Sequence, residues 1–318
     1  MPLPLAPPVL PQLARSAREL PDGEGWAYEP KWDGFRVIAF VDGAEVTLQS
    51  RNGKPLTRYF PDLDALPEGR YVLDGEIVIR DASGREDFDA LSQRIHPAKS
   101  RIARLAEETP ARLVAFDLLA AGDELLTERP LRERRTVLET LVSAAGPPLE
   151  LTPFKLSAAA AEPWLHSAEG VIAKELEAPY RSGERLGIVK VKRVRTIDCV
   201  VKGWRPGKAE NTVGSLILGL YEDDGALVEV GHSSGFAAKE KRELVGKLAP
   251  YETGERGTGE PSRWKSDKEL EWIVLRPELV VEITFDHTSG RRIRHGAKVQ
   301  RWREDKPPRE CKIAQLFA

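Results

Sequence analysis

Short apolar runs, each of strand length and bounded by turn residues, dominate this sequence and limit the folds open to it. Residues 35–50 contain two such runs joined across Asp42-Gly43, a pair of residue types that favours a tight hairpin turn. Further runs occupy residues 70–85, 111–121, 169–177 and 185–207. A chain patterned in this way predicts many strands and few helices, and we assign it to the α+β class.

Helical spacing is confined to a few segments. Residues 85–95 and 129–145 have it, the second with Pro130 placed near its first turn. Later in the chain we expect a hairpin over 214–236, a helix over 237–251 and a strand over 275–287. Several short strands with one helix suit a small closed β-barrel. The polar, Gly-rich residues 251–269 are predicted to form a surface loop.

The length of 318 residues exceeds what one core usually serves and suits two domains. The change of pattern near Arg195 sets the predicted boundary. We therefore expect a first domain of antiparallel sheets with helices over residues 1–195, and a barrel domain over residues 196–318.

Composition excludes several classes of protein. Hydrophobic residues at 41% and charged residues at 31% are ordinary for a globular chain and argue against a disordered or fibrous one. No apolar run of about 18 residues occurs, so no membrane span is predicted. The first residues lack a basic region and are interrupted by prolines, which indicates an extended leader rather than a signal peptide and a cytoplasmic protein. Cys199 and Cys311 are too few for a disulfide framework and are expected to be buried thiols.

Charge is distributed unevenly despite the net charge of −2. Residues 185–208 hold eight basic residues against one acidic residue, and residues 291–306 hold seven against two. Because lysine and arginine gain affinity by displacing counterions from a phosphate backbone, these two basic segments predict a groove for nucleic acid. A solvated charged face is the alternative.

The segment "YEPKWDGFRVIAF" at residues 28–40 begins with charges inside an otherwise apolar run. If it is extended throughout, Glu29, Lys31 and Asp33 share one face, while Tyr28 and Trp32 share the other. Taken alone, this pattern fits a solvated strand edge with an ion pair. Its interpretation depends on the charged motifs that follow it.

Seven charged motifs follow one another along the chain: KWDGFR (31–36), SRNG (50–53), LDGEIV (73–78), VAFDLL (114–119), EGVIAK (169–174), VKVK (189–192) and RWREDK (301–306). The series resembles the nucleotidyltransferase motifs of ATP-dependent DNA ligases and covers nearly the whole chain after the leader. With "RPELVVEITF" and "REDKPPREC" in the second half, it is most similar to the compact bacterial ligases of the LigC type and to the ligase module of the end-joining enzyme LigD.

The resemblance implies a nucleotidyltransferase (adenylation) domain followed by an OB-fold domain. It implies an ATP-dependent DNA ligase of DNA repair, which seals nicks in duplex DNA through a lysyl-AMP and a DNA-adenylate. We expect a monomer, with repair proteins as candidate partners. Two other functions stay open: an RNA ligase or capping-type nucleotidyltransferase, and a non-catalytic DNA-end-binding protein.

The catalytic residues follow from the motifs. By the resemblance, Lys31 is the adenylylated nucleophile; an amine attacks only when unprotonated, and a free lysine has a pKa of about 10.4, so its surroundings must activate it. A nearby lysine, partial burial or a bound metal would each favour the neutral amine. Lys190 and Lys192 share a strand face by the two-residue period and would reach the phosphate. Arg303 and Lys306 would hold the pyrophosphate when the second domain closes.

Nucleotide-binding residues are carried over by position. Glu76 would hydrogen-bond the ribose and Phe116 would stack on adenine, although without the resemblance Phe116 would be taken for a core aromatic. Glu29 would orient Lys31 or contact adenine. Lys174, which ends EGVIAK, is assigned to the same nucleotide site.

Three further residues complete the predicted site. Glu169 matches the metal-binding carboxylate of the family, a hard ligand suited to Mg²⁺ or Mn²⁺. Arg36 and Arg51 match arginines that contact the nick 5′-phosphate and the nucleotide, where a planar guanidinium binds better than lysine. The chain departs from the family at Ile188, where tryptophan is usual, and the role of Asp33 stays open.

Overall fold

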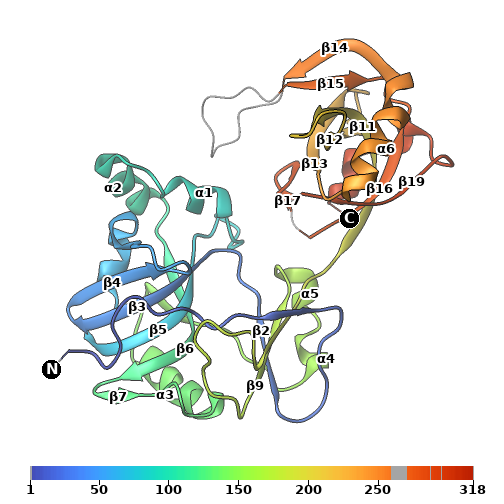
Figure 1. Ribbon diagram of the computed structural model, residues 1–318. Coiled ribbons are helices and arrows are strands. Elements are labelled where there is room, and N and C mark those ends of the chain that lie inside the picture. The colour runs from blue at the N-terminus through green and yellow to red at the C-terminus, as the bar shows by residue number, and fades with distance from the viewer. Residues whose placement is uncertain (1, 259–270, 287, 295, 318) are drawn as a thin grey trace. The chain divides into compact units, whose positions relative to one another are not determined.

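The computed structural model describes residues 2–258, 271–286, 288–294 and 296–317. The chain divides into two compact units, Met1–Arg193 and Val194–Ala318, which we call unit 1 and unit 2 (Figure 1). Both contain mainly antiparallel sheets with few helices, as the α+β assignment predicts.

The larger sheet of unit 1 has the strand order β4-β3-β5-β6-β7, with β8 parallel to β6 (Figure 1). Its strands are β3 (Phe35–Gly43), β4 (Glu45–Ser50), β5 (Gly69–Val78), β6 (Arg112–Ala121), β7 (Glu124–Leu125) and β8 (Leu149–Leu151). The predicted hairpin is confirmed, because Asp42 pairs with Glu45 across the turn. Gly43 takes φ +65°, a conformation that L side chains adopt with difficulty.

Both faces of this sheet are buried. The odd-numbered apolar residues of β3 face the main core of unit 1, whereas Ile38 and Phe40 face the opposite side. The leader covers that second side with Leu3, Leu5 and Val9. The Gln49 side chain holds the leader in place, since its Oε1 accepts from Val9 N at 2.9 Å and its Nε2 donates to Val9 O at 2.6 Å.

The smaller sheet of unit 1 has the order β1-β10-β9-β2. Its strands are β1 (Arg15–Ala17), β2 (Trp26–Pro30), β9 (Val171–Glu175) and β10 (Ile188–Val191). Because β2 ends at Pro30, the alternation of faces does not continue through residues 31–33, and the prediction that Lys31 and Trp32 point to opposite sides of a strand is wrong. Residues 31–33 belong to no strand, although Lys31 N still donates to Gly170 O at 2.9 Å, next to the last pair of β2 and β9.

The helices of unit 1 are α1 (Phe88–Gln93), α2 (Lys99–Glu108), α3 (Leu131–Ser143), α4 (Ala158–Ala161) and α5 (Trp164–Ser167), with 3-10 turns η1 (Thr57–Tyr59) and η2 (Pro61–Ala65). The predicted helices over 85–95 and 129–145 are confirmed as α1 and α3, the latter with Pro130 at its N-cap. We did not predict α2, in which Ile102 is the one buried residue.

The main sheet of unit 2 has seven strands: β11 (Arg195–Pro206), β12 (Val213–Tyr221), β13 (Leu227–Ser233), β14 (Glu252–Thr258), β15 (Glu271–Leu275), β16 (Val280–Phe285) and β19 (Lys298–Trp302). The long strand β11 pairs along one edge with β12, and along the other with β16 and then β15. One strand that serves two stretches of a sheet is typical of an OB-like barrel, in agreement with the prediction.

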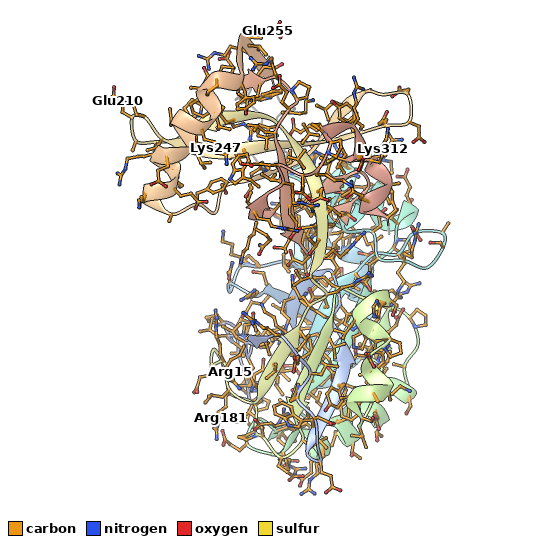
Figure 2. All side chains as sticks on the ribbon, turned by 90° about the vertical axis from the view of Figure 1, so that its right-hand side faces the viewer. Arg15, Arg181, Glu210, Lys247, Glu255 and Lys312 are labelled. Carbon is orange, nitrogen blue, oxygen red and sulfur yellow. The ribbon has the colours of Figure 1, made fainter. Side chains whose placement is uncertain are left out.

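The remaining elements of unit 2 are α6 (Ala238–Leu248), the short strands β17 (Thr288–Ser289) and β18 (Arg292–Ile293), and the 3-10 turns η3 (Ala249–Tyr251), η4 (Pro308–Glu310) and η5 (Ile313–Leu316). Lys247 of α6, labelled in Figure 2, lies 4.0 Å from the centre of the Trp302 ring. The predicted hairpin over 214–236 and helix over 237–251 are confirmed.

The loop predicted over 251–269 is wrong in its first part, where β14 pairs with β15. The side chains of β14 are mostly exposed. Because this strand at the end of the sheet buries neither face, its sequence shows no alternation of apolar and polar residues that would predict a strand. Residues 259–269, and His287 at the end of the predicted strand over 275–287, lie outside the described residues. Cys199 and Cys311 are free and buried, as predicted. In the described part of the chain, no helix has the length and apolarity to cross a membrane.

Candidate active site

A pocket in unit 1 collects six of the predicted site residues. It encloses about 500 Å³ of empty space, part of it open to solvent. The predicted residues in its lining are Glu29, Lys31, Arg36, Glu76, Phe116 and Lys174, and the others are Gln12, Ala14, Pro30, Trp32, Ile172 and Ile188.

Lys31 belongs to a group of three charged side chains from separate parts of the chain, which are joined through Glu169. Its Nζ forms an ion pair with Oε2 of Glu169, and Oε1 of Glu169 accepts from Lys192 Nζ at 2.5 Å. The Glu169 side chain is only 6% exposed, so both of its oxygens depend on these partners. Gly170 permits the approach, because a Cβ there would lie 2.3 Å from the main-chain oxygen of Val191.

Lys190 and Arg51 extend this positive cluster. Partial burial lowers the pKa of Lys190, and the charges of Lys192, Lys31 and Arg51 lower it further, against the opposing effect of Glu169. Arg51 is exposed and directly follows β4. The cluster thus carries an excess of positive charge and suits a phosphate-bearing ligand.

Glu76 lies next to this cluster on β5, in register with Arg36 on β3. Burial raises the pKa of Glu76 to about 8, although Arg36 and Lys31 act in the opposite direction. Gly34 brings the loop that carries Lys31 close to β5, since a Cβ there would lie 2.2 Å from the main-chain oxygen of Ile77. The sequence K-W-D-G therefore needs its glycine for this approach.

Arg36 is held inside the pocket. Its Nε and Nη2 each donate to Asp74 at 2.6 Å, and Tyr180 donates to the same carboxylate at 2.6 Å. The guanidinium carbon lies 4.5 Å from the centre of the Phe116 ring, and Lys174 Nζ lies 4.7 Å from that centre. Phe116 therefore offers an aromatic surface to the pocket, flanked by two cations.

Glu29 is buried at the back of the pocket. Its Oε2 pairs with Lys174 Nζ at 2.8 Å, and Lys174 also donates to the main-chain oxygen of Phe116 at 3.0 Å. Burial raises the pKa of Glu29, while Lys174 and Arg135 oppose the rise. A buried carboxylate and a buried ammonium in the lining of a pocket can form hydrogen bonds with the polar edge of a ligand.

Comparison with known proteins bears on this arrangement. A model of the ATP dependent DNA ligase domain matches residues 8–192, and a model of the ATP dependent DNA ligase C terminal region matches residues 209–306. The chain belongs to the ATP-dependent DNA ligase family. Membership makes it an ATP-dependent enzyme that acts on DNA and uses a divalent metal.

Individual relatives agree with this assignment. DNA ligase C2 of Mycolicibacterium smegmatis is 46% identical over 99% of this chain and 96% of its own length. DNA ligase C of Mycobacterium tuberculosis is 45% identical over the same shares. The solved ligase domain of LigD from M. tuberculosis is 31% identical, covers 95% of this chain and 97% of its own, and superimposes with a TM-score of 0.53.

Two predicted catalytic residues of the ligase lie in unit 2. Arg303 Nη1 pairs with Asp198 at 3.0 Å and with Glu282 at 3.4 Å, and its Nη2 pairs with Asp305 at 2.8 Å. Hydrogen bonding to Arg303 lowers the pKa of Asp305 to about 2. Lys306 pairs with Glu310 at 3.0 Å. Both basic residues therefore have carboxylate partners within their own unit.

Several residues of the ligase pocket were not predicted. Gln12 comes from the leader, where no motif marks it, and its main-chain N donates to Tyr180 OH at 2.9 Å. Trp32, which follows Lys31, donates from Nε1 to Thr152 Oγ1 at 3.0 Å and lines the pocket. Ile188, at the position where the family usually has tryptophan, lines the pocket with an aliphatic side chain.

The donor set for a divalent metal is small. Within the residues that the structure describes, no three or more histidine, cysteine, aspartate or glutamate side chains form a group that could hold an ion. Glu169 offers hard carboxylate oxygens. Mg²⁺ in particular is commonly bound by one or two carboxylates together with substrate phosphates. The site therefore fits an ion that is bound jointly with the nucleotide.

Proposed function

We propose that this ligase seals nicks in duplex DNA through three nucleotidyl-transfer steps that begin at Lys31. The Nζ of Lys31 attacks the α-phosphorus of ATP and pyrophosphate leaves, which forms lysyl-AMP. A 5′-phosphate oxygen at the nick then attacks the same phosphorus and releases the lysine, which forms a DNA-adenylate. Finally the 3′-hydroxyl attacks the 5′-phosphate and AMP leaves. The location of Lys31 in a pocket beside Glu169 and Lys192 is the observation that carries the proposal.

Lys31 must present a free electron pair for the first step. In the structure it pairs with Glu169, so that pair opens and the proton leaves before or during the attack. Lys190 and Lys192 place positive charge where negative charge develops on the α-phosphate. Both would act in the first two steps, in which the α-phosphorus reacts, and in the third step they would stabilise the phosphate of the departing AMP.

The pocket would hold the adenosine part of ATP. Glu76 would accept a hydrogen bond from the ribose, Phe116 would stack on the base, and Glu29 with Lys174 would contact its polar edge. Support comes from the shared lining of one pocket by all four side chains. Arg36 and Arg51 would bind the nucleotide and the nick 5′-phosphate through planar guanidinium groups.

Glu169 would hold Mg²⁺ or Mn²⁺ together with the phosphates. The ion would neutralise phosphate charge and so lower the barrier to nucleophilic attack. Glu169 would exchange its contacts with Lys31 and Lys192 for the ion when ATP is bound.

Arg303 and Lys306 would hold the departing pyrophosphate in the first step only. For this, their side chains would leave the carboxylates that they contact in unit 2 and would bind the phosphate oxygens of pyrophosphate, which carries more negative charge. The two basic segments would bind the duplex during the later steps. We propose further that the ligase is a monomer of DNA repair; in support of repair, a 33% identical relative is named a multifunctional non-homologous end joining DNA repair protein.

Incubation with α-labelled ATP and then with nicked duplex tests the proposal. We expect the label to join the protein and move to DNA, Lys31→Ala to remain unlabelled, and NAD to be inactive as a donor. Full labelling of Lys31→Ala would overturn the assignment of the nucleophile.

The same assay separates the alternatives. A preference for GTP would indicate a capping-type enzyme, and sealing of nicked RNA in preference to DNA would indicate an RNA ligase. Binding of DNA without any labelling of the protein would indicate a non-catalytic end-binding protein.

A further inference from the structure

A chain of hydrogen bonds joins the leader to Arg36. Tyr180, in the segment between β9 and β10, donates from its hydroxyl to Asp74 Oδ2 at 2.6 Å. The same hydroxyl accepts from the main-chain N of Gln12, a residue of the leader, at 2.9 Å. Asp74 in turn accepts from Nε and Nη2 of Arg36, each at 2.6 Å. One tyrosine therefore connects the leader with a side chain that lines the pocket.

The groups of this chain are enclosed by protein. Asp74 is 0% exposed and Tyr180 is 3% exposed. A buried carboxylate loses the hydrogen bonds of water and needs donors from the protein instead. Burial and the charge of Asp74 raise the pKa of Tyr180, so its hydroxyl keeps its proton. Because the main-chain N–H of Gln12 can only donate, the hydroxyl accepts there and directs its own hydrogen to Asp74.

The leader also contacts Arg36 directly. Nη2 of Arg36 donates to the main-chain oxygen of Gln12 at 3.2 Å, so Gln12 meets the chain at both ends. Nε and Nη2 are used for these contacts, and a ligand would be bound through Nη1. The Arg36 side chain keeps 26% of its surface exposed, which leaves it accessible from the pocket.

Contacts outside the pocket hold the leader in this position. Gln49 on β4 forms two hydrogen bonds with the main chain of Val9. Ser182 Oγ donates to the main-chain oxygen of Leu10 at 2.6 Å, from the segment between β9 and β10. The position of Gln12 therefore depends on how the preceding residues of the leader are bound.

We propose that Tyr180 is a positioning residue that couples the bound leader to Arg36 through Asp74, so that the leader completes the nucleotide site and fixes the direction of the Arg36 guanidinium. This positioning role rests on the proposed function, which assigns Arg36 to the nucleotide and the nick 5′-phosphate.

A purely structural role for Tyr180 predicts a different result. In that case loss of the hydroxyl would lower activity by the same factor whether or not Arg36 is present. A double-mutant cycle of Tyr180→Phe and Arg36→Met separates the two roles, because residues that act through one contact have non-additive effects. The quantity compared is kcat/KM for formation of lysyl-AMP from ATP, followed by intact mass of the full-length protein.

Tyr180→Phe should lower kcat/KM about tenfold in the unmodified ligase, as for the loss of a hydrogen bond to a charged group. In the Arg36→Met background the same substitution should change kcat/KM by less than about twofold. The effect of Tyr180 should thus depend on the presence of Arg36.

Tyr71→Phe is the matched control. Tyr71 is a buried tyrosine on β5, the strand that carries Asp74, and its hydroxyl donates to the main-chain oxygen of Pro67 at 2.5 Å. We expect Tyr71→Phe to lose stability, as any buried hydroxyl deletion does, and to keep kcat/KM within about twofold of the unmodified value.

The leader can be tested without changing the tyrosine. Gln49→Ala combined with Ser182→Ala removes hydrogen bonds to the leader from two side chains outside the described lining of the pocket. This variant should lower kcat/KM by about threefold or more, and by less than about twofold when Arg36→Met is already present. It also keeps the test available if Tyr180→Phe does not fold.

Equal losses from Tyr180→Phe with and without Arg36 would overturn the inference. Unchanged labelling after Gln49→Ala with Ser182→Ala would also overturn it, because the leader would then have no part in placing Arg36. Failure of ATP to label the unmodified protein would instead contradict the proposed function.

Discussion

Glu76→Gln should make the ligase more stable at pH 8 while reducing its activity. Glu76 is partly buried between Arg36 and Lys31, and burial raises its pKa to about 8 from an ordinary value of 4.5. The folded state therefore holds a proton between these pH values that the unfolded state has lost. Glutamine is close to the neutral acid in shape and carries no charge to bury.

The sign and size follow from proton linkage. A raised pKa in the folded state gives a contribution to stability that is complete below pH 4.5 and is lost as the pH rises to about 8. One pKa unit corresponds to 1.36 kcal/mol, so the loss is at most about 5 kcal/mol. Because the side chain is partly exposed and water relaxes around it, we expect about 2 kcal/mol in favour of Glu76→Gln at pH 8.

Urea unfolding of both proteins at pH 5, 6, 7 and 8, with EDTA and without nucleotide, measures this difference. The free energy of unfolding of Glu76→Gln should gain on that of the unmodified ligase at each step from pH 5 to pH 8. Lys31 labelling by ATP should fall in the same variant above about pH 8, where the unmodified Glu76 is ionised and its carboxylate accepts from the ribose more strongly than an amide does. A stability difference that stays constant over this range would refute the reasoning.

Three further outcomes are expected. Arg303→Ala should strongly reduce labelling of the protein by ATP and largely preserve the sealing of a nick that already carries AMP. Lys190→Ala should impair both reactions. If Arg303→Ala instead impaired sealing and preserved labelling, Arg303 would have no role in the first step. Arg134→Met should lower the free energy of unfolding by about 3–5 kcal/mol, because it leaves Asp117 buried and unpaired, and a loss below about 1 kcal/mol in urea would contradict this. Binding to nicked DNA should weaken with salt at a log-log slope of about −0.9 per phosphate neutralised, and a flat dependence would remove the two basic segments from the DNA interface.

Much of the fold was predictable because its signals are local. The turn residues Asp42 and Gly43, the alternation in β3 and the helical spacing of α3 each depend on a few neighbouring residues. The strand β14 was missed for the converse reason. Its side chains are exposed, and it is a strand only because β15 lies beside it.

Candidate site residues were predictable as types in a motif series, but their contacts were not. Lys31 and Glu169 form an ion pair across 138 positions of sequence. Three other contacts depend equally on how the sheets of unit 1 pack: the ion pair of Arg36 with Asp74, the approach of Arg135 to Glu29, and the position of Gln12 in the pocket lining.

The sequence by itself determined most of the strands, the order of the motifs, and the presence of Lys31 and other basic residues in that motif series. Only the tertiary structure decided which charges are buried together, and hence that the pKa of Glu76 rises to about 8 while that of Lys190 falls. The physical reason is that backbone pattern is set by neighbours along the chain. The charge state of a side chain is set instead by the water it loses and the charges it meets, which come from distant segments.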